Sequence, residues 1–372
     1  MIAFTIRTIA KILTYVLALL TLVAAYSGYI DPNLWATPSL LTLPYPYLAL
    51  LTLIVGVIWL CMRRFIPAIV CALALIGGSA SLLANLPVAT TKEPRAGEKV
   101  FTIMTYNIIH GIDVRMKDAP QNRTLEYIIH SNADMVCVQE LYRLKKGEIQ
   151  NLTAGLLDTL RRVYPYQILD PKTDLALFSK YPARKVGDAE GHCWMKIYDL
   201  YRVNVRGTEI NVLNVHLAPF MLSEKERQVV TDIHGVRSAK NSLGELKGSI
   251  MTKMKQAYRN RSIDAGVIRS VADSIKGPLI ICGDFNDVPA SWTYRTIRGD
   301  DLHDAYADTG LGYMYTYNMH GFYFHIDQIL YRGPLRALQV EKGDINSSDH
   351  YPVTARFALV ARRKIAEPPR RK

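Results

Sequence analysis

The stretch that decides the fold is Leu279-Ile280-Ile281-Cys282-Gly283-Asp284-Phe285-Asn286-Asp287, an apolar run that ends in acidic and amide side chains. The apolar half has the length and composition of a buried β-strand. Folds built from strands and helices place their functional groups where strands end. Taken alone, the polar half is weak evidence, because Gly, Asp and Asn also favour turns.

Five further polar patches lie at the ends of apolar runs elsewhere in the chain. They are Tyr106-Asn107, Gln139-Glu140, Asn214-Val215-His216, His325-Ile326-Asp327 and Ser348-Asp349-His350. Singly, each has an ordinary interpretation as a solvated strand end or a structural histidine. Together they offer carboxylate and asparagine oxygens, which suit Mg²⁺ or Mn²⁺, together with histidines such as His216 and His350. A hard divalent ion beside a His–Asp pair suits the attack of water on a phosphate ester.

The chain around these patches alternates between strand-like and helix-like segments. Strands are expected at residues 100–106, 135–139, 175–179, 195–205, 210–215, 279–282, 326–331 and 353–359, and helices at 123–131, 149–164 and 258–275. Arg206-Gly207-Thr208 has the composition of a hairpin turn. Hairpins mixed with crossover helices predict an α/β sandwich with mixed sheets.

The order of the patches and the residues within them resemble the endonuclease–exonuclease–phosphatase superfamily, over about residues 100–360. The resemblance rests on Thr105-Tyr106-Asn107, Val138-Gln139-Glu140, Asn214-Val215-His216, Gly283-Asp284-Phe285-Asn286, Ile326-Asp327 and Ser348-Asp349-His350. It implies a four-layer α/β sandwich of two mixed β-sheets and a Mg²⁺-dependent (or Mn²⁺-dependent) phosphoesterase. One departure is Asp174, which stands where the family often has glycine.

The resemblance also implies roles for individual residues. The metal ligands would be Glu140, Asn107 and Asp349, and the catalytic residues would be His350, Asp327, Asp284, Asn286 and His216. Asp327 would orient His350, since a carboxylate fixes the tautomer of its partner imidazole. Whether Asp284 or His350 takes the proton from water stays open at this point. His110 and Asp113 are interpreted as ordinary loop residues in preference to substrate or supporting groups.

Three apolar segments near the start predict membrane-spanning helices, at residues 12–30, about 45–62 and 65–86. Basic residues flank the first span at Arg7 and Lys11 and fill the link after the second at Arg63 and Arg64. By the positive-inside rule these ends are cytoplasmic, so the rest of the chain lies outside the cytoplasm. Two alternatives are a buried hairpin of a soluble domain and, for the first span, a cleaved signal sequence.

These segments give a domain plan: residues 1–90 are an anchor embedded in the cell or inner membrane, and residues 91–99 are a linker. Residues 100–360 form the catalytic domain and residues 361–372 a basic tail. The lipid bilayer would be contacted through residues 12–86, and no obligate protein partner is expected. Five cysteines show no spacing that suggests a zinc site or a disulfide framework.

The formal net charge of +12 is unevenly distributed. The anchor, linker and tail carry most of the excess, which leaves about +3 for residues 101–361. So small an excess is not typical of a domain that grips a nucleic-acid duplex.

A long insertion after His216, residues 218–259, is rich in basic residues toward its end, from Arg237 to Arg261. Lys253, Lys255, Arg259 and Arg261 are predicted to bind substrate as part of a lid; a solvated helix face is the equal alternative. Aromatic residues before Asp327 suggest base stacking, a membrane contact or an ordinary packed loop.

Three functions fit the sequence. The first is a phosphodiesterase that acts on lipid head groups or other extracytoplasmic esters, because the domain is tethered close to the bilayer. The second is a nuclease for external DNA or RNA. The third, a membrane-bound binding module without catalysis, is disfavoured by the complete acidic and histidine set.

Overall fold

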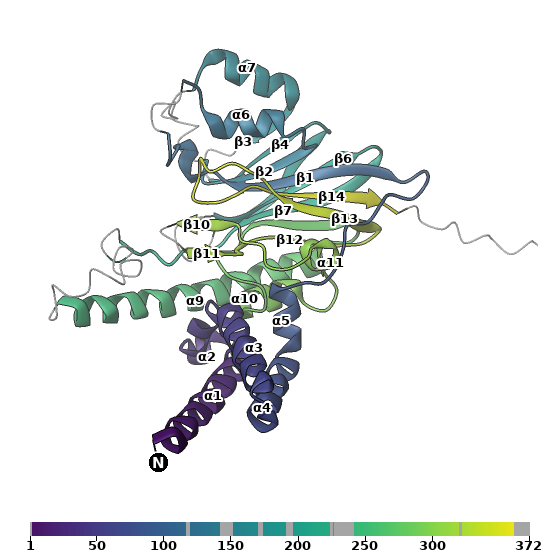
Figure 1. Cartoon of the computed structure of the whole chain (residues 1–372). Coiled ribbons are helices and arrows are strands. Elements are labelled where there is room, and N and C mark those ends of the chain that lie inside the picture. Colours follow the sequence, from purple (N-terminus) through teal and green to yellow (C-terminus); the bar gives the residue numbers. More distant parts are fainter. Residues whose placement is uncertain are drawn as a thin grey trace, which may run out of the picture.

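The computed structural model describes residues 2–116, 120–141, 152–169, 174–190, 196–223, 226, 242–319 and 322–360. The basic tail and residues 227–241 of the insertion lie outside the described residues. Within this part of the chain a bundle of apolar helices sits below a β-sandwich, and the long helix α9 (Ser242–Ser274) runs between the two (Figure 1).

Two six-stranded sheets form the catalytic domain. The first has the order β13-β14-β1-β2-β4-β3, and the second β5-β6-β7-β8-β12-β9. The strands of the first sheet are β1 (Lys99–Asn107), β2 (Met135–Gln139), β3 (Tyr166–Leu169), β4 (Ala176–Ser179), β13 (Leu335–Lys342) and β14 (Val353–Leu359). Those of the second are β5 (Ala183–Glu190), β6 (Lys196–Val205), β7 (Thr208–His216), β8 (Leu279–Asp284), β9 (His303–Asp304) and β12 (Asp327–Arg332).

Both sheets are mixed, as the sequence predicts. The pairs β1–β2 and β7–β8 are parallel, and the pairs that join β1 to β14 and β8 to β12 are antiparallel. The expected hairpin joins β6 and β7 through Arg206 and Gly207, both with positive φ, as a two-residue turn between twisted strands requires. A separate two-stranded ribbon of β10 (Tyr317–Met319) and β11 (Phe322–Phe324) precedes β12 and pairs with the segment before β14 through Tyr317 and His350.

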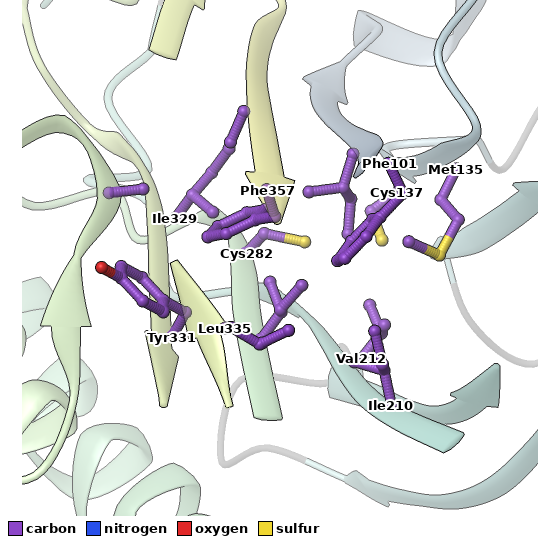
Figure 2. Close-up of a cluster of buried hydrophobic side chains, with 14 of the residues drawn as sticks. Phe101, Met135, Cys137, Ile210, Val212, Cys282, Ile329, Tyr331, Leu335 and Phe357 are labelled. Atoms are coloured by element: carbon purple, nitrogen blue, oxygen red, sulfur yellow. The ribbon is translucent and has the colours of Figure 1, made fainter. Parts of the chain in front are cut away.

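The two sheets pack face to face over a largely apolar layer. Phe101 and Phe357 of the first sheet stack with ring centroids 5.7 Å apart, and Val212, Cys282 and Ile329 of the second sheet face them (Figure 2). Each fully buried side chain of this size contributes about 1.5–3 kcal/mol to folding. The alternation of inward and outward side chains along these strands therefore places a core between the sheets.

Helices cover the outer faces of both sheets and complete four layers. Helices α6 (Arg123–His130) and α7 (Ala154–Val163) cover the first sheet, and α9 and α10 (Trp292–Arg298) cover the second (Figure 1). A short helix, α11 (Ala305–Thr309), follows β9. The α/β sandwich is confirmed. Helix α9 corrects the expected helix at 258–275, because it begins sixteen residues earlier, at Ser242.

The apolar N-terminal region forms α1 (Ile2–Ser27), α2 (Pro32–Trp35), a 3-10 turn at Pro38–Leu41, α3 (Tyr45–Cys61), α4 (Phe65–Gly77) and α5 (Ser79–Asn85). By length and hydropathy only α1 is a candidate span by itself, over Phe4–Ser27. The expectation of three spans is corrected accordingly. The second expected span is a shorter apolar helix of 17 residues. The third is a pair, α4 and α5, bent by 68°.

The N-terminal helices dock on the catalytic domain through specific polar contacts. Asn85 donates to the carbonyl of Pro289 at 3.0 Å, and Arg295 donates to Ser81 at 2.9 Å. Gly28 lies so close to the backbone of Ala290 that a Cβ atom there would stand 1.9 Å from its carbonyl oxygen. These contacts join the N-terminal helices to the loop that follows Asp287 and to helix α10.

Candidate active site

The register of the strands brings the polar patches together. Parallel pairing of β1 with β2 puts Asn107 opposite Gln139, next to Glu140. Parallel pairing of β7 with β8 sets His216 opposite Asp284, and antiparallel pairing of β12 with β8 sets Asp327 opposite the same Asp284. Asp284 therefore lies at the centre of the group.

The amide of Asn107 joins two carboxylates that come from different sheets. Its Nδ2 donates to Oε1 of Glu140 at 3.1 Å and to Oδ2 of Asp284 at 3.0 Å. Its Oδ1 accepts from the backbone NH of Ile109 at 3.1 Å. A second amide hydrogen bond joins the two sheets, because Gln139 of β2 donates to Asn214 of β7 at 2.6 Å. These buried bridges fix the spacing of the carboxylates.

His216 lies against both of these carboxylates. Its Nε2 is 3.7 Å from Oε1 of Glu140 and 3.8 Å from Oδ2 of Asp284, and it has no hydrogen-bond partner among the described residues. Burial acts to raise the pKa of Glu140, but His216, the Asn107 hydrogen bond and His350 outweigh it and hold that pKa below its usual value. Glu140 is thus held as a carboxylate.

His350 is paired with Asp327 on the other side of Asp284. Nδ1 of His350 lies 2.9 Å from Oδ2 of Asp327, and Nε2 lies 3.6 Å from Oδ2 of Asp284. Burial acts to lower the pKa of His350, yet Asp327 and Asp284 outweigh it and raise that pKa well above its usual value. The Tyr317 ring packs edge-on against the imidazole, with centroids 5.1 Å apart.

The turn after β8 is shaped to present Asp284. Gly283 has φ 145°, and a Cβ atom there would stand 1.9 Å from the carbonyl oxygen of Val215. Asn286, in the left-handed region at φ 50°, donates its backbone NH to Oδ1 of Asp284 at 2.7 Å. Its side-chain amide donates to the carbonyl of Leu217 at 2.9 Å. The turn therefore aligns Asp284 with the strand that carries His216.

Sequence comparison agrees with this geometry. Residues 104–350 match the Endonuclease/Exonuclease/phosphatase family. The chain belongs to this family. Members of the Endonuclease/Exonuclease/phosphatase family are hydrolases that act on phosphate esters and typically depend on a divalent metal. Residues 7–84 match a family described only as a domain of unknown function. No curated protein sequence matches the chain.

Solved structures of this family resemble the chain at the level of fold. The human nocturnin catalytic domain is 17% identical and has a TM-score of 0.45, covering 72% of this chain and 100% of its own. Truncated Caenorhabditis elegans TDP2 is 15% identical with a TM-score of 0.44, covering 70% and 97%. Sphingomyelinase C from Streptomyces griseocarneus is 18% identical with a TM-score of 0.40, covering 69% and 99%. Likeness this distant selects no substrate.

The acidic side of the site fits the divalent ion that the family uses. Asp349 is buried, and burial together with the charge of Glu140 raises its pKa. Burial and the charge of Asp284 likewise raise the pKa of Asp327, although His350 opposes this. Carboxylates that raise one another's pKa in a buried space gain from a shared cation. Their oxygens are hard donors, which suits Mg²⁺ or Mn²⁺.

Two groups of residues are candidates for holding the ion. The sequence predicts Glu140, Asn107 and Asp349; ligand atoms of Asp284, Asp327 and His350 also lie within 4.8 Å of one another. We favour the first group, because Asp327 and His350 already bond to each other and an imidazole is a poor ligand for a hard ion.

Arg261 is not where the sequence prediction puts it. It is fully buried, so it does not contact substrate as predicted. Its guanidinium donates to the carbonyls of Ala218 at 3.2 Å and Asn286 at 2.6 Å, and Nε lies 3.5 Å from Asp287. Arg261 therefore ties together the chain segments that follow His216 and Asp284. A sequence offers no sign that separates such an arginine from its exposed neighbours on the same helix.

The other three predicted substrate-binding residues also lie on α9. Lys253 pairs with the buried carboxylate of Glu226 at 2.6 Å, so its charge is already engaged. Lys255 is partly exposed and Arg259 is exposed, and neither forms an ion pair with any residue that the structure describes. The four basic residues therefore do not form one patch.

His110 is closer to the site than sequence reasoning suggested. Its Nε2 lies 3.6 Å from Oε2 of Glu140, and its backbone NH donates to the Glu140 carbonyl at 2.9 Å. Positive φ angles at Ile109, His110 and Glu140 bring His110 close to Glu140, and no sequence pattern predicts these angles. Asp113 is structural, as expected, because it pairs with Arg123 at 3.0 Å.

Proposed function

We propose that this chain is a membrane-tethered phosphodiesterase that uses Mg²⁺ or Mn²⁺ and whose catalytic domain lies outside the cytoplasm. The observation that carries the proposal is the shared carboxylate Asp284, which lies between His216 with Glu140 on one side and His350 with Asp327 on the other. A phosphate ester placed over this group meets a metal-binding side, a proton acceptor and two imidazoles.

The metal would be held by Glu140 and Asp349, with Asn107 beside them. When bound, it would neutralise charge on the phosphoryl oxygens and lower the barrier to attack by water. Asn107 already holds Glu140 and Asp284 at fixed spacing through its amide, so the acidic groups are positioned before any ion binds.

In this proposal the two imidazoles donate protons or hydrogen bonds, and Asp284 accepts a proton. The raised pKa of His350 supports a protonated ring that donates a hydrogen bond to a phosphoryl oxygen, where charge develops during attack. That leaves Asp284 to accept the proton of the attacking water. Its Oδ1 is held by the NH of Asn286, while Oδ2 faces the histidines. His216 would donate to the phosphate or assist the leaving group.

A location at the membrane surface is supported by the N-terminal helices. α1 is long and apolar enough to span a bilayer, and α3 and the α4–α5 pair are apolar as well. The start of α1, which carries Arg7 and Lys11, and the link from α3 to α4, which holds Arg63 and Arg64, lie at the end of the bundle remote from the catalytic domain (Figure 1). This is the arrangement the positive-inside rule expects for an extracytoplasmic domain.

The substrate that fits best is a lipid head group or another ester near the outer face of the membrane. The docked anchor supports this, since it holds the site near the bilayer. The nuclease alternative loses support, because Arg261 is buried and Lys253 is paired, so the predicted basic surface for a polyanion is reduced.

The test is hydrolysis by the full chain in nanodiscs with Mg²⁺. Plasmid DNA, a phosphocholine lipid and a phosphoinositide are offered in parallel to the wild type, to His350→Ala and to His130→Ala, an exposed histidine on α6 that serves as the control. We expect turnover of a lipid that needs Mg²⁺ and His350 but not His130. Turnover of DNA alone would favour the nuclease, and no metal binding with no turnover would overturn the proposal.

A further inference from the structure

Four of the exposed aromatic side chains of the N-terminal region lie at one level. Tyr26 and Tyr29 at the end of α1, Trp35 of α2 and Tyr47 at the start of α3 are 49–59% exposed. Tyrosine and tryptophan collect where a bilayer meets water. These chain segments lie where the bundle meets the catalytic domain, since Arg295 stacks on the Tyr29 ring at 3.8 Å and Tyr47 donates to the carbonyl of Tyr323 at 3.0 Å. This level is therefore that of the lipid head groups, if the helices are embedded as proposed above.

Helix α9 lies at the same level. Ser262, in its middle, bonds to Asp31 at 2.8 Å and to Asn33 at 3.0 Å, and both partners stand between Tyr29 and Trp35 in the chain. Figure 1 shows α9 crossing the end of the bundle, with its amino end projecting beyond the sandwich. The projecting half therefore extends past the bundle, and Figure 1 draws no other described helix or strand beside it on the bundle's side.

One stripe of α9 carries Lys255 and Arg259, which form no ion pair with any residue that the structure describes. Met251, Lys255, Arg259 and Ser262 are spaced by four, four and three residues, which puts them on one face of a helix. Since Ser262 contacts the anchor, this face is the one that turns toward the membrane level. Met251 is 42% exposed, Arg259 is exposed and Lys255 is partly so. An apolar side chain beside cations suits the boundary between acyl chains and phosphates.

We propose that this face of α9 binds the phosphate groups of anionic phospholipids in the membrane that holds the anchor. The proposal rests on the membrane location proposed above and adds a second contact with the bilayer. Lys255 and Arg259 supply the charge, and the Ser262 contacts fix the height of the helix. Bound in this way, α9 fixes the tilt of the catalytic domain, and through Arg261 it also supports the turn that carries Asn286.

The test measures whether the middle of α9 touches lipid. The full chain carries Cys61→Ser and Cys193→Ser, so that the remaining cysteines, at positions 71, 137 and 282, are buried. A polarity-sensitive fluorophore is attached at Met251→Cys, at Leu50→Cys on the exposed face of α3, or at Asp158→Cys on α7. The protein is placed in nanodiscs of phosphatidylcholine with or without phosphatidylglycerol, which also contain lipids with a nitroxide quencher.

We expect the label at 251 to be quenched by head-group nitroxides in discs with phosphatidylglycerol and less so at high salt or without it. The pair Lys255→Glu and Arg259→Glu should abolish this quenching, whereas the matched pair Arg161→Glu and Arg162→Glu on α7, at the opposite end of the molecule, should not. The proposal would be overturned if the label at 251 were quenched no more than the label at 158. It would also be overturned if quenching at 251 were the same with and without phosphatidylglycerol and were unchanged by Lys255→Glu with Arg259→Glu.

The label at position 50 separates this failure from a failure of the membrane location. If it is quenched by nitroxides deep in the acyl region while position 251 is not, only the α9 contact is wrong. If it is not quenched either, the membrane embedding on which the proposal rests is wrong. Hydrolysis measured on the same discs reports the chemistry independently of both.

Discussion

Asp327 and His350 form a buried pair in which Oδ2 of the carboxylate lies 2.9 Å from Nδ1 of the imidazole. The pair holds the ring so that Nε2 faces Asp284 at 3.6 Å. The backbone of Asp327 is itself fixed, because its NH donates to Oγ1 of Thr316 at 3.0 Å. The carboxylate therefore determines both the orientation and the charge of His350.

Asp327→Asn should keep the fold and lower kcat by about 10²–10⁴-fold, since the amide neither fixes the tautomer nor stabilises a protonated ring. KM should change little, because Asp327 lies behind His350 and away from substrate. Steady-state rates of the full chain on its best substrate check this. Asp158→Asn on α7 is the control, and an unchanged kcat in Asp327→Asn would show that the pair has no role in turnover.

Glu140→Gln should weaken Mn²⁺ binding by roughly 10–100-fold or more, because a charged oxygen ligand is lost. Isothermal titration of the full chain with Mn²⁺ measures this without reference to activity. Asp344→Asn, an exposed carboxylate, should bind Mn²⁺ as the wild type does. Equal Mn²⁺ affinities of the wild type and Glu140→Gln would indicate that the ion is bound instead by Asp284, Asp327 and His350. The ligand atoms of these three residues lie within 4.8 Å of one another.

Much of the site can be predicted from the sequence, because residues at the ends of neighbouring paired strands lie close together in space. Asp284, Asp327 and His216 occupy facing register positions on neighbouring strands, so an apolar run followed by a polar residue places each correctly. The hairpin at Arg206-Gly207 is predictable for a similar reason, since the local residues determine the turn.

Other features could not be read from the sequence, because they depend on contacts between distant segments. Arg261 and Arg259 are two residues apart on one helix, yet one is buried against Asn286 and Asp287 and the other is exposed. The bend at Gly78 breaks an apolar run that looks continuous, and it is packed against Ala25 and Tyr45 from other helices. Hydropathy alone predicts neither the burial of Arg261 nor the bend at Gly78.

Arg261→Met should destabilise the protein by about 3–5 kcal/mol, because it leaves the buried Asp287 without its cationic partner. It should also lower kcat, since the carbonyl of Asn286 loses its hydrogen bond of 2.6 Å. Thermal unfolding and rates of the full chain in detergent are the measurements.

Two further variants make the Arg261 prediction specific. Arg162→Met, an exposed arginine on α7, should change neither quantity. Arg261→Met combined with Asp287→Asn should recover part of the lost stability, because no charge is then left buried, but not the lost kcat. Recovery of both would mean that Arg261 acts on stability alone.

Gly283→Ala should abolish activity and lower the melting temperature sharply, because the new Cβ would meet the carbonyl oxygen of Val215 at 1.9 Å. The strand pair that carries His216 and Asp284 would have to separate. Gly207→Ala is the matched control, since Gly207 also has positive φ, at 92°, but no atom within 4 Å of its Cβ position. That variant should cost only about 1–3 kcal/mol of backbone strain and keep kcat. Equal losses in both variants would contradict the role of the close approach.

His325 should make the protein less stable as the pH falls. Its ring is buried beside Tyr306 with centroids 5.4 Å apart, and burial lowers its pKa from 6.5 to about 3. Between these two pH values the unfolded chain binds a proton at this site that the folded chain excludes. The folded state therefore loses stability as pH drops from 6.5 toward 3, by about 1.4 kcal/mol per pH unit for one proton.

His325→Phe keeps a ring in the same place and removes this proton, so the melting temperature of the variant should fall less steeply than that of the wild type between neutral pH and pH 4. Comparing the two curves is necessary, because buried carboxylates such as Asp327, whose pKa is raised, contribute the opposite slope in the same range. His130→Phe, at an exposed position, should follow the wild-type curve. Parallel curves for the wild type and His325→Phe would mean that His325 takes up a proton in the folded protein as readily as in the unfolded chain, contrary to its burial.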